Sequence, residues 1–178
     1  MITKTKADVA RKGSMITKTM VIKSGYVALY SAYDGGNVLE YISGGGTIYQ
    51  GDYTYGICLT DVEYTPYRQQ QPIEEAETFF TLTKFNAAKG RENIERKIDH
   101  LIWSCYHVHG YRSGGNWCLP YHLTHLMIAE ALGIRRVTVT KRFSELRELG
   151  YVEGDKRSPF AVTPLGQKHL ESIIDILS

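Results

Sequence analysis

The chain has 178 residues, of which 43% are hydrophobic, and a formal net charge of +2 at pH 7. This length suffices for one large or two small domains, and no apolar run approaches the roughly 18–20 residues of a membrane span. No secretory signal is visible, and Cys58, Cys105 and Cys118 lack the spacing of a disulfide framework. We therefore expect a cytoplasmic protein with no membrane partner.

The pentapeptide MITKT occurs twice, at residues 1 and 15, and Gly13-Ser14 directly precede the second copy. Such a pair is compatible with a cloning scar and equally with a native turn. The sequence leaves both readings open.

Residues 15–65 alternate short apolar runs with turn signals and so predict strands. Asp34-Gly35 between two such runs is a strong hairpin signal, and Gly44-Gly45-Gly46 marks a further turn. Short strands at intervals of about ten residues are typical of a small antiparallel barrel or sandwich. The many tyrosines of this region suit the surface of such a barrel, and an aromatic ligand pocket is the alternative.

Residues 66–72 are bounded by prolines and predict a linker, and residues 73–89 predict a helix with acidic residues in its first turn. This helix carries a stripe formed by Ala76, Phe79, Phe80, Thr83 and Ala87. An apolar stripe between two domains needs a partner, and a second copy of the helix would supply one in a two-fold dimer.

A further helix is predicted over residues 91–109. The residues expected on its inner face are Ile94, Ile98, Leu101, Ile102 and Cys105. Residues 110–116 then read as a loop.

Residues 123–149 predict two helices joined by a tight turn. Thr124 can cap the first helix, and Gly133 suits the sharp turn that follows it. The first helix is expected to bury Leu126, Ala129 and Leu132. The second begins near Arg136 and is expected to bury Val139, Phe143 and Leu146. The arrangement is that of a helix-turn-helix, whose second helix enters the major groove of DNA.

The outer face of the second helix is basic and rich in hydroxyl groups, with Arg136, Thr138, Thr140, Lys141 and Arg142. Residues 135–142 contain no acid and form the local basic patch that DNA binding requires, whatever the net charge. The alternative is an ordinary pair of helices in a bundle.

The chain after this pair predicts two short strands around a polar stretch at 153–158, and then a helix that opens at Thr163-Pro164. A helix-turn-helix followed by a hairpin is a winged helix. Lys156 and Arg157 would lie at the tip of the wing.

A cluster of cysteines and histidines occupies residues 105–125, and such side chains are common metal ligands. The candidate ligands are Cys105, His109, Cys118 and His122. Their spacing matches no standard zinc pattern, and core or capping roles explain most of them, so we predict no metal site.

Two strings, IERKIDHLIWSCYHVHG and LPYHLTHLMIAEALGIRRVTVTKRFSELRELGYVE, resemble the C-terminal half of the Crp/Fnr family of bacterial transcription regulators. The strings KGSMITKTMVIKSGYVALYSAYDGG, YISGG and LTDVEY resemble the family's cyclic-nucleotide-binding-type β-roll. The resemblance spans about residues 9–165. It implies a β-roll sensor, a dimerising helix and a winged helix that binds a palindromic site. It also implies RNA polymerase as a partner.

The resemblance also assigns roles to residues. Arg136 is the expected base reader, able to donate two hydrogen bonds to guanine. Val137 would contact or exclude a thymine methyl, and Thr140 and Lys141 would face the groove further along. Phosphate contacts, which position the protein without specifying sequence, would come from Thr138, Arg142, Lys156 and Arg157. The chain departs from the family at Arg135, where a Ser or Thr cap is usual, and at Arg142, where the residue is usually apolar.

The β-roll region lacks the family's means of holding cyclic AMP. The family's Gly-Glu-Leu turn is replaced by Gly51-Asp52-Tyr53, and no arginine lies between residues 24 and 67. A cyclic phosphate diester needs a cation or a nest of N–H groups, and Asp52 would repel it. We expect no cyclic nucleotide and, since the family's four-cysteine pattern is absent, no iron–sulfur cluster.

The sequence thus predicts an α+β protein with a shortened β-roll over residues 1–68, a linker and dimerisation helix over 69–90, and a winged-helix DNA-binding domain over 91–178. We expect a homodimeric, sequence-specific transcription regulator on a palindromic operator, with no catalytic residues and no cofactor. One alternative is a winged helix that binds protein. The other is a small β-barrel enzyme, which would need histidines on its strands, whereas all six histidines lie at position 100 or later.

Overall fold

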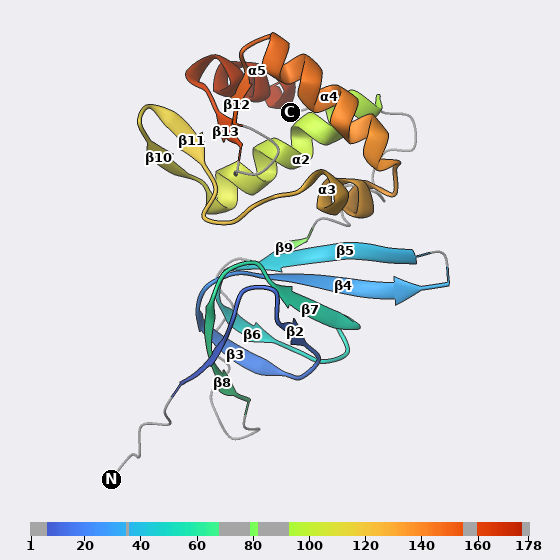
Figure 1. The fold of residues 1–178 in the computed structure, drawn as a ribbon, viewed down its shortest axis with the longest axis vertical. Coiled ribbons are helices and arrows are strands. Elements are labelled where there is room, and N and C mark those ends of the chain that lie inside the picture. Colours follow the sequence, from blue (N-terminus) through green and yellow to red (C-terminus); the bar gives the residue numbers. More distant parts are fainter. Residues whose placement is uncertain (1–6, 35, 68–78, 82–92, 155–159, 176–178) are drawn as a thin grey trace. The chain divides into compact units, whose positions relative to one another are not determined.

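Among the residues that the structure describes, strands make up the regular structure up to residue 81, and helices dominate after it (Figure 1). The computed structural model describes residues 7–34, 36–67, 79–81, 93–154 and 160–175. The chain divides into two units, Met1–Thr81 (unit 1) and Leu82–Ser178 (unit 2). The division falls within the segment 69–90 that the sequence predicts as a linker.

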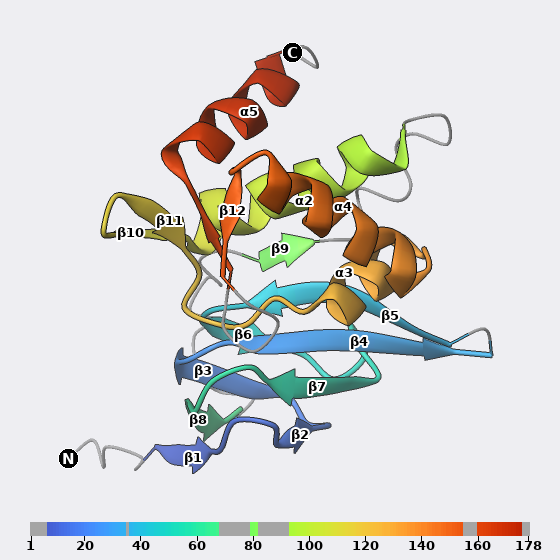
Figure 2. The same ribbon diagram turned by 45° about the horizontal axis from the view of Figure 1, so that its top comes forward.

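The described residues of unit 1 form two antiparallel sheets with strand orders β1-β8-β3-β6 and β2-β7-β4-β5-β9 (Figure 2). The strands are β1 (Asp8–Ala10), β2 (Met15–Ile16), β3 (Met20–Ser24), β4 (Val27–Tyr33), β5 (Gly36–Ser43), β6 (Gly46–Ile48), β7 (Tyr55–Cys58), β8 (Val62–Pro66) and β9 (Phe79–Thr81). Apolar residues of both sheets share one buried cluster, which includes Ile22, Leu29, Ile48 and Val62. The predicted antiparallel β domain is confirmed.

The β4–β5 hairpin forms where the sequence places it. Tyr33 pairs with Gly36, so the chain reverses at the predicted Asp-Gly signal. Several tyrosines of the unit contribute to packing. Tyr30 stacks on Tyr55 with ring centroids 5.1 Å apart. Tyr53 is buried and donates its hydroxyl to the Lys18 carbonyl at 2.8 Å.

Residues 8–14 are built into unit 1. Strand β1 pairs with β8, and Arg11 forms an exposed ion pair with Asp61 at 2.7 Å. Gly13 has φ of +84° and donates its N–H to the Cys58 carbonyl at 2.8 Å. Gly13-Ser14 therefore form a turn of the fold.

The predicted helix over residues 73–89 is wrong at residues 79–81. These residues form β9, which pairs with β5 in the register Tyr41↔Thr81 and Ser43↔Phe79. Two aromatic residues and a threonine have high strand propensity, and the edge of β5 supplies the backbone partners that a strand needs. The rest of the predicted helix lies outside the described residues.

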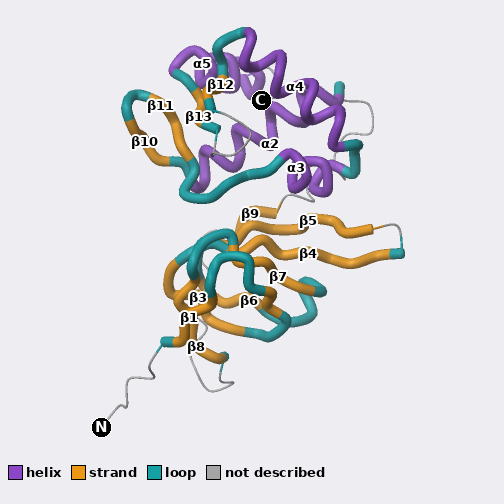
Figure 3. The backbone as a smooth tube through the Cα atoms, in the orientation of Figure 1, coloured by secondary structure: helices purple, strands orange, loops and turns teal. Residues whose placement is uncertain are grey.

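In its described residues, unit 2 packs four helices with a small antiparallel sheet of order β10-β11-β13-β12 (Figure 3). Its elements are α2 (Ile94–His109), β10 (Tyr111–Ser113), β11 (Asn116–Cys118), α3 (His125–Leu132), α4 (Arg136–Glu148), β12 (Val152–Glu153), β13 (Ala161–Val162) and α5 (Pro164–Asp175). The winged-helix order of elements is confirmed. The β10–β11 hairpin stands where the sequence predicted a loop; it turns at Gly114 and Gly115, both with positive φ.

The core of unit 2 follows the predicted helix faces with two corrections. Ile98, Leu101, Ile102 and Cys105 of α2 are fully buried, but Ile94 is 44% exposed because it begins the helix and projects beyond the residues that cover the later turns. Leu126 of α3 is 49% exposed, whereas Ile128 is fully buried. Two residues correspond to about 200° of rotation around a helix, so Leu126 points nearly opposite to Ile128. No helix of the described residues is long and apolar enough to cross a membrane.

Candidate nucleic-acid interface

The turn between α3 and α4 has the geometry that its residues predict. The Thr124 hydroxyl accepts a hydrogen bond from the Met127 N–H at 3.1 Å and so caps α3. Gly133 ends α3 in the left-handed conformation, with φ of 62°, and the Ile134 N–H then reaches back to the Ala129 carbonyl at 3.0 Å. This closure turns the chain within a few residues and sets α4 against α3 as a helix-turn-helix.

The inner face of α4 is apolar and fixes the helix in the unit. Val139, Phe143 and Leu146 are buried, as predicted. The Phe143 ring lies 4.5 Å from the His125 ring and 4.6 Å from the Phe160 ring, measured between centroids. One aromatic side chain thus joins α4 to the start of α3 and to the residue before β13.

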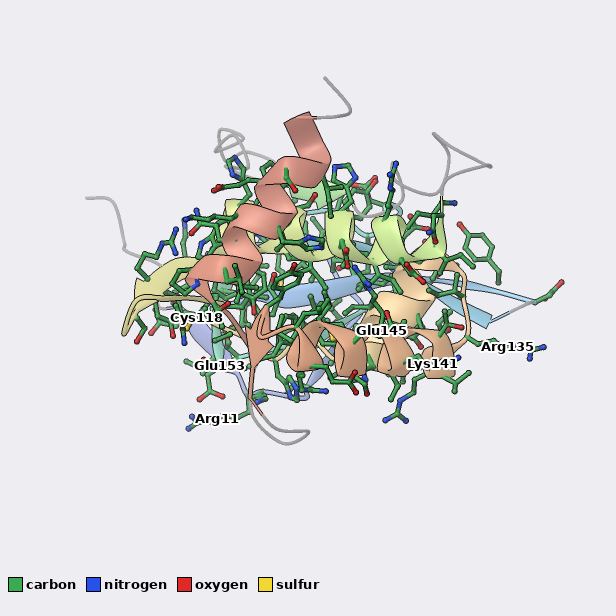
Figure 4. All side chains as sticks on the ribbon, turned by 90° about the horizontal axis from the view of Figure 1, so that it is seen from above. Arg11, Cys118, Arg135, Lys141, Glu145 and Glu153 are labelled. Atoms are coloured by element: carbon green, nitrogen blue, oxygen red, sulfur yellow. The ribbon has the colours of Figure 1, made fainter. Side chains whose placement is uncertain are left out.

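The outer face of the N-terminal half of α4 is open to solvent. Arg136, Val137 and Lys141 are exposed, with Val137 at 64%, and Thr138 is half-buried. Arg135 precedes the helix without any side-chain capping bond, and its side chain extends outward at that end of α4 (Figure 4). The predicted base-reading residues Arg136, Val137 and Lys141 are therefore accessible at one end of α4. Arg135 adds a further cation beside them.

An open groove of about 520 Å³ lies between the start of α3 and one flank of α4. Its basic side chains are Arg136, Arg147, His122 and His125, its hydroxyl groups include Thr140 and Ser144, and none of its lining residues is acidic. Such a lining favours an anion such as a DNA phosphate. Ser144, Arg147 and His122 were not predicted for this site, although the spacing 136, 140, 144 and 147 does place those residues on one helix face.

The Thr140 side chain lines the groove and is held by two contacts. Its hydroxyl donates to the Arg136 carbonyl at 3.1 Å, and its oxygen lies 3.1 Å from Nδ1 of His125. Because the hydroxyl proton is used by the carbonyl, Nδ1 of His125 is the donor in the second contact. This contact orients the imidazole at the first residue of α3.

Arg142 does not occupy the place expected of a phosphate ligand. Its Nε donates to Oδ1 of Asp99 at 3.0 Å, its Nη2 donates to Oδ2, and its side chain is only 12% exposed. The guanidinium points into unit 2 because a buried carboxylate on α2 attracts it, and an arginine at this usually apolar position is thereby explained. The phosphate role predicted for Arg142 is corrected to an internal ion pair.

The wing is anchored to α4. Val152 pairs with Val162 across β12 and β13, and Nε of Arg147 donates to the Gly154 carbonyl at 3.2 Å. The predicted tip residues Lys156 and Arg157 lie outside the described residues.

Two members of the predicted cysteine and histidine cluster, Cys105 and His109, serve the core. The Cys105 thiol is buried, which raises its pKa to about 12, and it is hydrogen-bonded by Tyr121. Nδ1 of His109 lies 2.7 Å from the same tyrosine hydroxyl. Among the residues that the structure describes, no three His, Cys, Asp or Glu side chains come together as metal ligands.

Acid is expected to destabilise unit 2 through His109. Burial lowers the pKa of His109 from 6.5 to about 4. Between these values the unfolded chain binds a proton that the folded chain does not, so stability falls as pH falls from about 6.5 toward 4. We expect His109→Gln to reduce the loss in unfolding free energy between about pH 7 and pH 4.5 by roughly 2 kcal/mol, allowing for partial exposure of the ring.

Urea unfolding followed by circular dichroism at both pH values checks this expectation. His107→Gln is the matched control, since His107 lies on the same helix but is exposed. An acid-induced loss that is the same in His109→Gln as in the parent chain would show that another group causes it.

Comparison with known proteins agrees with this geometry. Residues 95–164 match the model of the Crp-like helix-turn-helix domain. The fold is similar to TTHA1359, a CRP/FNR-family transcriptional regulator from Thermus thermophilus, with 17% identity, 96% of this chain and 98% of that chain covered, and a TM-score of 0.71.

Two further structures show the same likeness. The CRP-family regulator TTHB099 from Thermus thermophilus is 13% identical over 93% of this chain and 95% of that chain, with a TM-score of 0.70. FixK2 from Bradyrhizobium japonicum is 13% identical over 94% of this chain and 96% of that chain, with a TM-score of 0.63. A comparison with curated protein sequences gives no match.

Proposed function

We propose that this chain is a transcription regulator of the Crp/Fnr type that binds a palindromic DNA operator as a homodimer. The proposal is supported by the match of residues 95–164 to the Crp-like helix-turn-helix domain and by the similar fold. A helix-turn-helix of this type supports DNA binding and transcription regulation, and it favours these roles over that of an enzyme.

The observation that carries the proposal is the exposed N-terminal end of α4, which lies beside the groove that no acidic residue lines. Arg136, Val137 and Lys141 project from the part of the helix that a helix-turn-helix inserts into the major groove. A guanidinium at the first residue of the helix can donate two hydrogen bonds to guanine, and an exposed valine suits the methyl group of thymine. Base reading is therefore proposed for Arg136 and Val137, with Lys141 further along the groove.

Phosphate binding is proposed for the groove that flanks α4. Arg147, His122 and the start of α3 provide cationic and N–H donors around the Thr140 and Ser144 hydroxyl groups. Thr138 remains a candidate for a phosphate contact at the beginning of α4. Contacts of this kind fix the protein on the duplex and make its affinity fall with salt.

Homodimerisation is proposed from the way in which a recognition helix contacts DNA. One recognition helix contacts only a few base pairs, and a two-fold dimer presents a second helix to a half-site one helical turn away. A palindromic operator would then follow from the symmetry of the dimer.

We propose further that a cyclic nucleotide is not the effector. The β-roll sequence between residues 24 and 67 contains no arginine and no lysine, and Asp52 occupies the region where the phosphate would lie. A cyclic phosphate diester has no side-chain cation to pair with there.

Replacing Arg136 with alanine tests the proposed reading. We expect affinity for the selected operator to fall by about 1–3 kcal/mol, and the base preference at one position of each half-site to relax. Affinity for a non-specific duplex should change little. Fluorescence anisotropy on the two duplexes provides both numbers.

Arg96→Ala is the matched control, because Arg96 is an exposed arginine of α2 in the same unit. It removes the same charge without touching α4. The Arg136→Ala variant is compared with Arg96→Ala on each duplex. If the two variants show the same loss of affinity for the operator and the same loss for non-specific DNA, Arg136 contributes charge alone and does not read a base.

A further inference from the structure

Arg142 and Asp99 form a two-point contact between the recognition helix α4 and the helix α2. The guanidinium donates to both carboxylate oxygens, from Nε to Oδ1 at 3.0 Å and from Nη2 to Oδ2. Asp99 is 1% exposed and the Arg142 side chain 12% exposed. This is a bidentate contact, whose parallel hydrogen bonds impose direction as well as attraction.

Three helices meet at the same carboxylate. Nε2 of His169, on α5, lies 3.2 Å from Oδ2 of Asp99. Nη1 of Arg142 also donates to Glu145 at 3.1 Å, within α4, and lies 4.0 Å from Glu95 on α2. The orientation of Arg142 is thus determined from both of the helices that it joins.

The apolar inner face of α4 does not specify the rotation of the helix as sharply. Val139, Phe143 and Leu146 are buried by side-chain packing, and the hydrophobic effect that buries them is non-directional. The ends of helical side chains lie about 5–6 Å from the axis, so a rotation of about 10° moves them by about 1 Å. Hydrogen bonds to base edges do not survive such an error.

Arg142 is well placed to prevent a small rotation of α4. It directly follows Lys141 and lies six residues after Arg136, so a rotation that shifts the base-reading residues also pulls its guanidinium off the carboxylate. We propose that Asp99 and Arg142 are positioning residues, which set the rotation of α4 so that Arg136, Val137 and Lys141 meet the base edges. This inference rests on the proposed function in DNA reading.

The double variant Asp99→Leu/Arg142→Met separates positioning from stability. It removes one anion and one cation, so the net charge is unchanged. Replacing a buried ion pair by apolar residues is often neutral or stabilising, and we expect a melting temperature at or above that of the parent chain. The ratio of operator affinity to non-specific affinity should nevertheless fall about tenfold or more, with the salt dependence of non-specific binding unchanged.

Three other outcomes would contradict the positioning role or the proposed function. A double variant that keeps the parent's affinity ratio shows that the pair only stabilises the unit. A salt slope that falls by about one shows that Arg142 contacts a phosphate instead. A parent chain that selects no operator overturns the proposed function, and the positioning role with it.

Arg142→Lys covers the case in which the double variant does not fold. Lysine keeps the charge but lacks the planar fork, so we expect a lower affinity ratio with an unchanged salt slope. An Arg142→Lys variant with the parent's ratio would overturn the positioning role by itself.

Discussion

Replacing Arg142 with alanine is expected to lower the unfolding free energy of unit 2 by about 3–5 kcal/mol. The change leaves the carboxylate of Asp99, 1% exposed, without its bidentate partner. A buried anion without its cation costs more than the pair contributes, because the charge remains out of water. His169 offers only one nitrogen to the carboxylate, at 3.2 Å.

Urea unfolding followed by tryptophan fluorescence measures this loss selectively. Both tryptophans of the chain, Trp103 and Trp117, belong to unit 2. Arg96→Ala removes an exposed arginine from the same unit and should change stability by about 0.5 kcal/mol or less. A loss below about 1 kcal/mol in Arg142→Ala would mean that Asp99 is rehydrated or finds another partner when Arg142 is removed.

Replacing Phe143 with alanine is expected to cost about 3–5 kcal/mol and to weaken DNA binding as well. The ring is fully buried and lies 4.5 Å from His125 and 4.6 Å from Phe160, between centroids. Its removal leaves a cavity where α4 meets the start of α3. Because His125 and Phe160 also line the groove, the same cavity loosens the proposed phosphate-binding surface.

Phe143→Leu is the graded comparison, since it retains an apolar side chain and should cost about 1–2 kcal/mol. Leu165→Ala is the control for apolar truncation at a site that is 55% exposed. If Phe143→Ala and Phe143→Leu unfold at the same urea concentration, packing at this position is loose and the ring does not fix α4.

The features of this chain that were predictable from sequence are those with local causes. Thr124 and Gly133 mark the ends of α3 by capping and by the left-handed turn, and both act within a few residues. The Asp-Gly signal at residue 34 likewise closes a hairpin between neighbouring strands. The helix-turn-helix and the β4–β5 hairpin were correctly predicted for this reason.

The features that were missed depend on partners distant in the chain. Strand β9 exists through pairing with β5, whose residues lie almost forty positions earlier. Arg142 has the pattern of a surface cation, and only its contact with Asp99, 43 positions away, removes it from the DNA-facing set. Helical periodicity predicted that Leu126 is buried, but the helices packed on α3 cover its opposite side.

The groove beside α4 is an intermediate case. Arg136, Thr140, Ser144 and Arg147 share a helix face in the sequence, but the second wall comes from residues 122–125, whose contact with α4 depends on the turn at Gly133. A local pattern could therefore identify one wall, and the tertiary fold was needed for the other.

Selection of the full chain on a pool of random DNA duplexes, with and without cyclic AMP, tests most directly whether the chain reads a palindromic site without a cyclic nucleotide. We predict a site with half-sites about 10–11 base pairs apart, enriched equally in both conditions, while Arg136→Ala enriches a site relaxed at one position per half-site. A pool that stays random under both conditions would contradict sequence-specific DNA binding, and enrichment only with cyclic AMP would contradict the effector proposal.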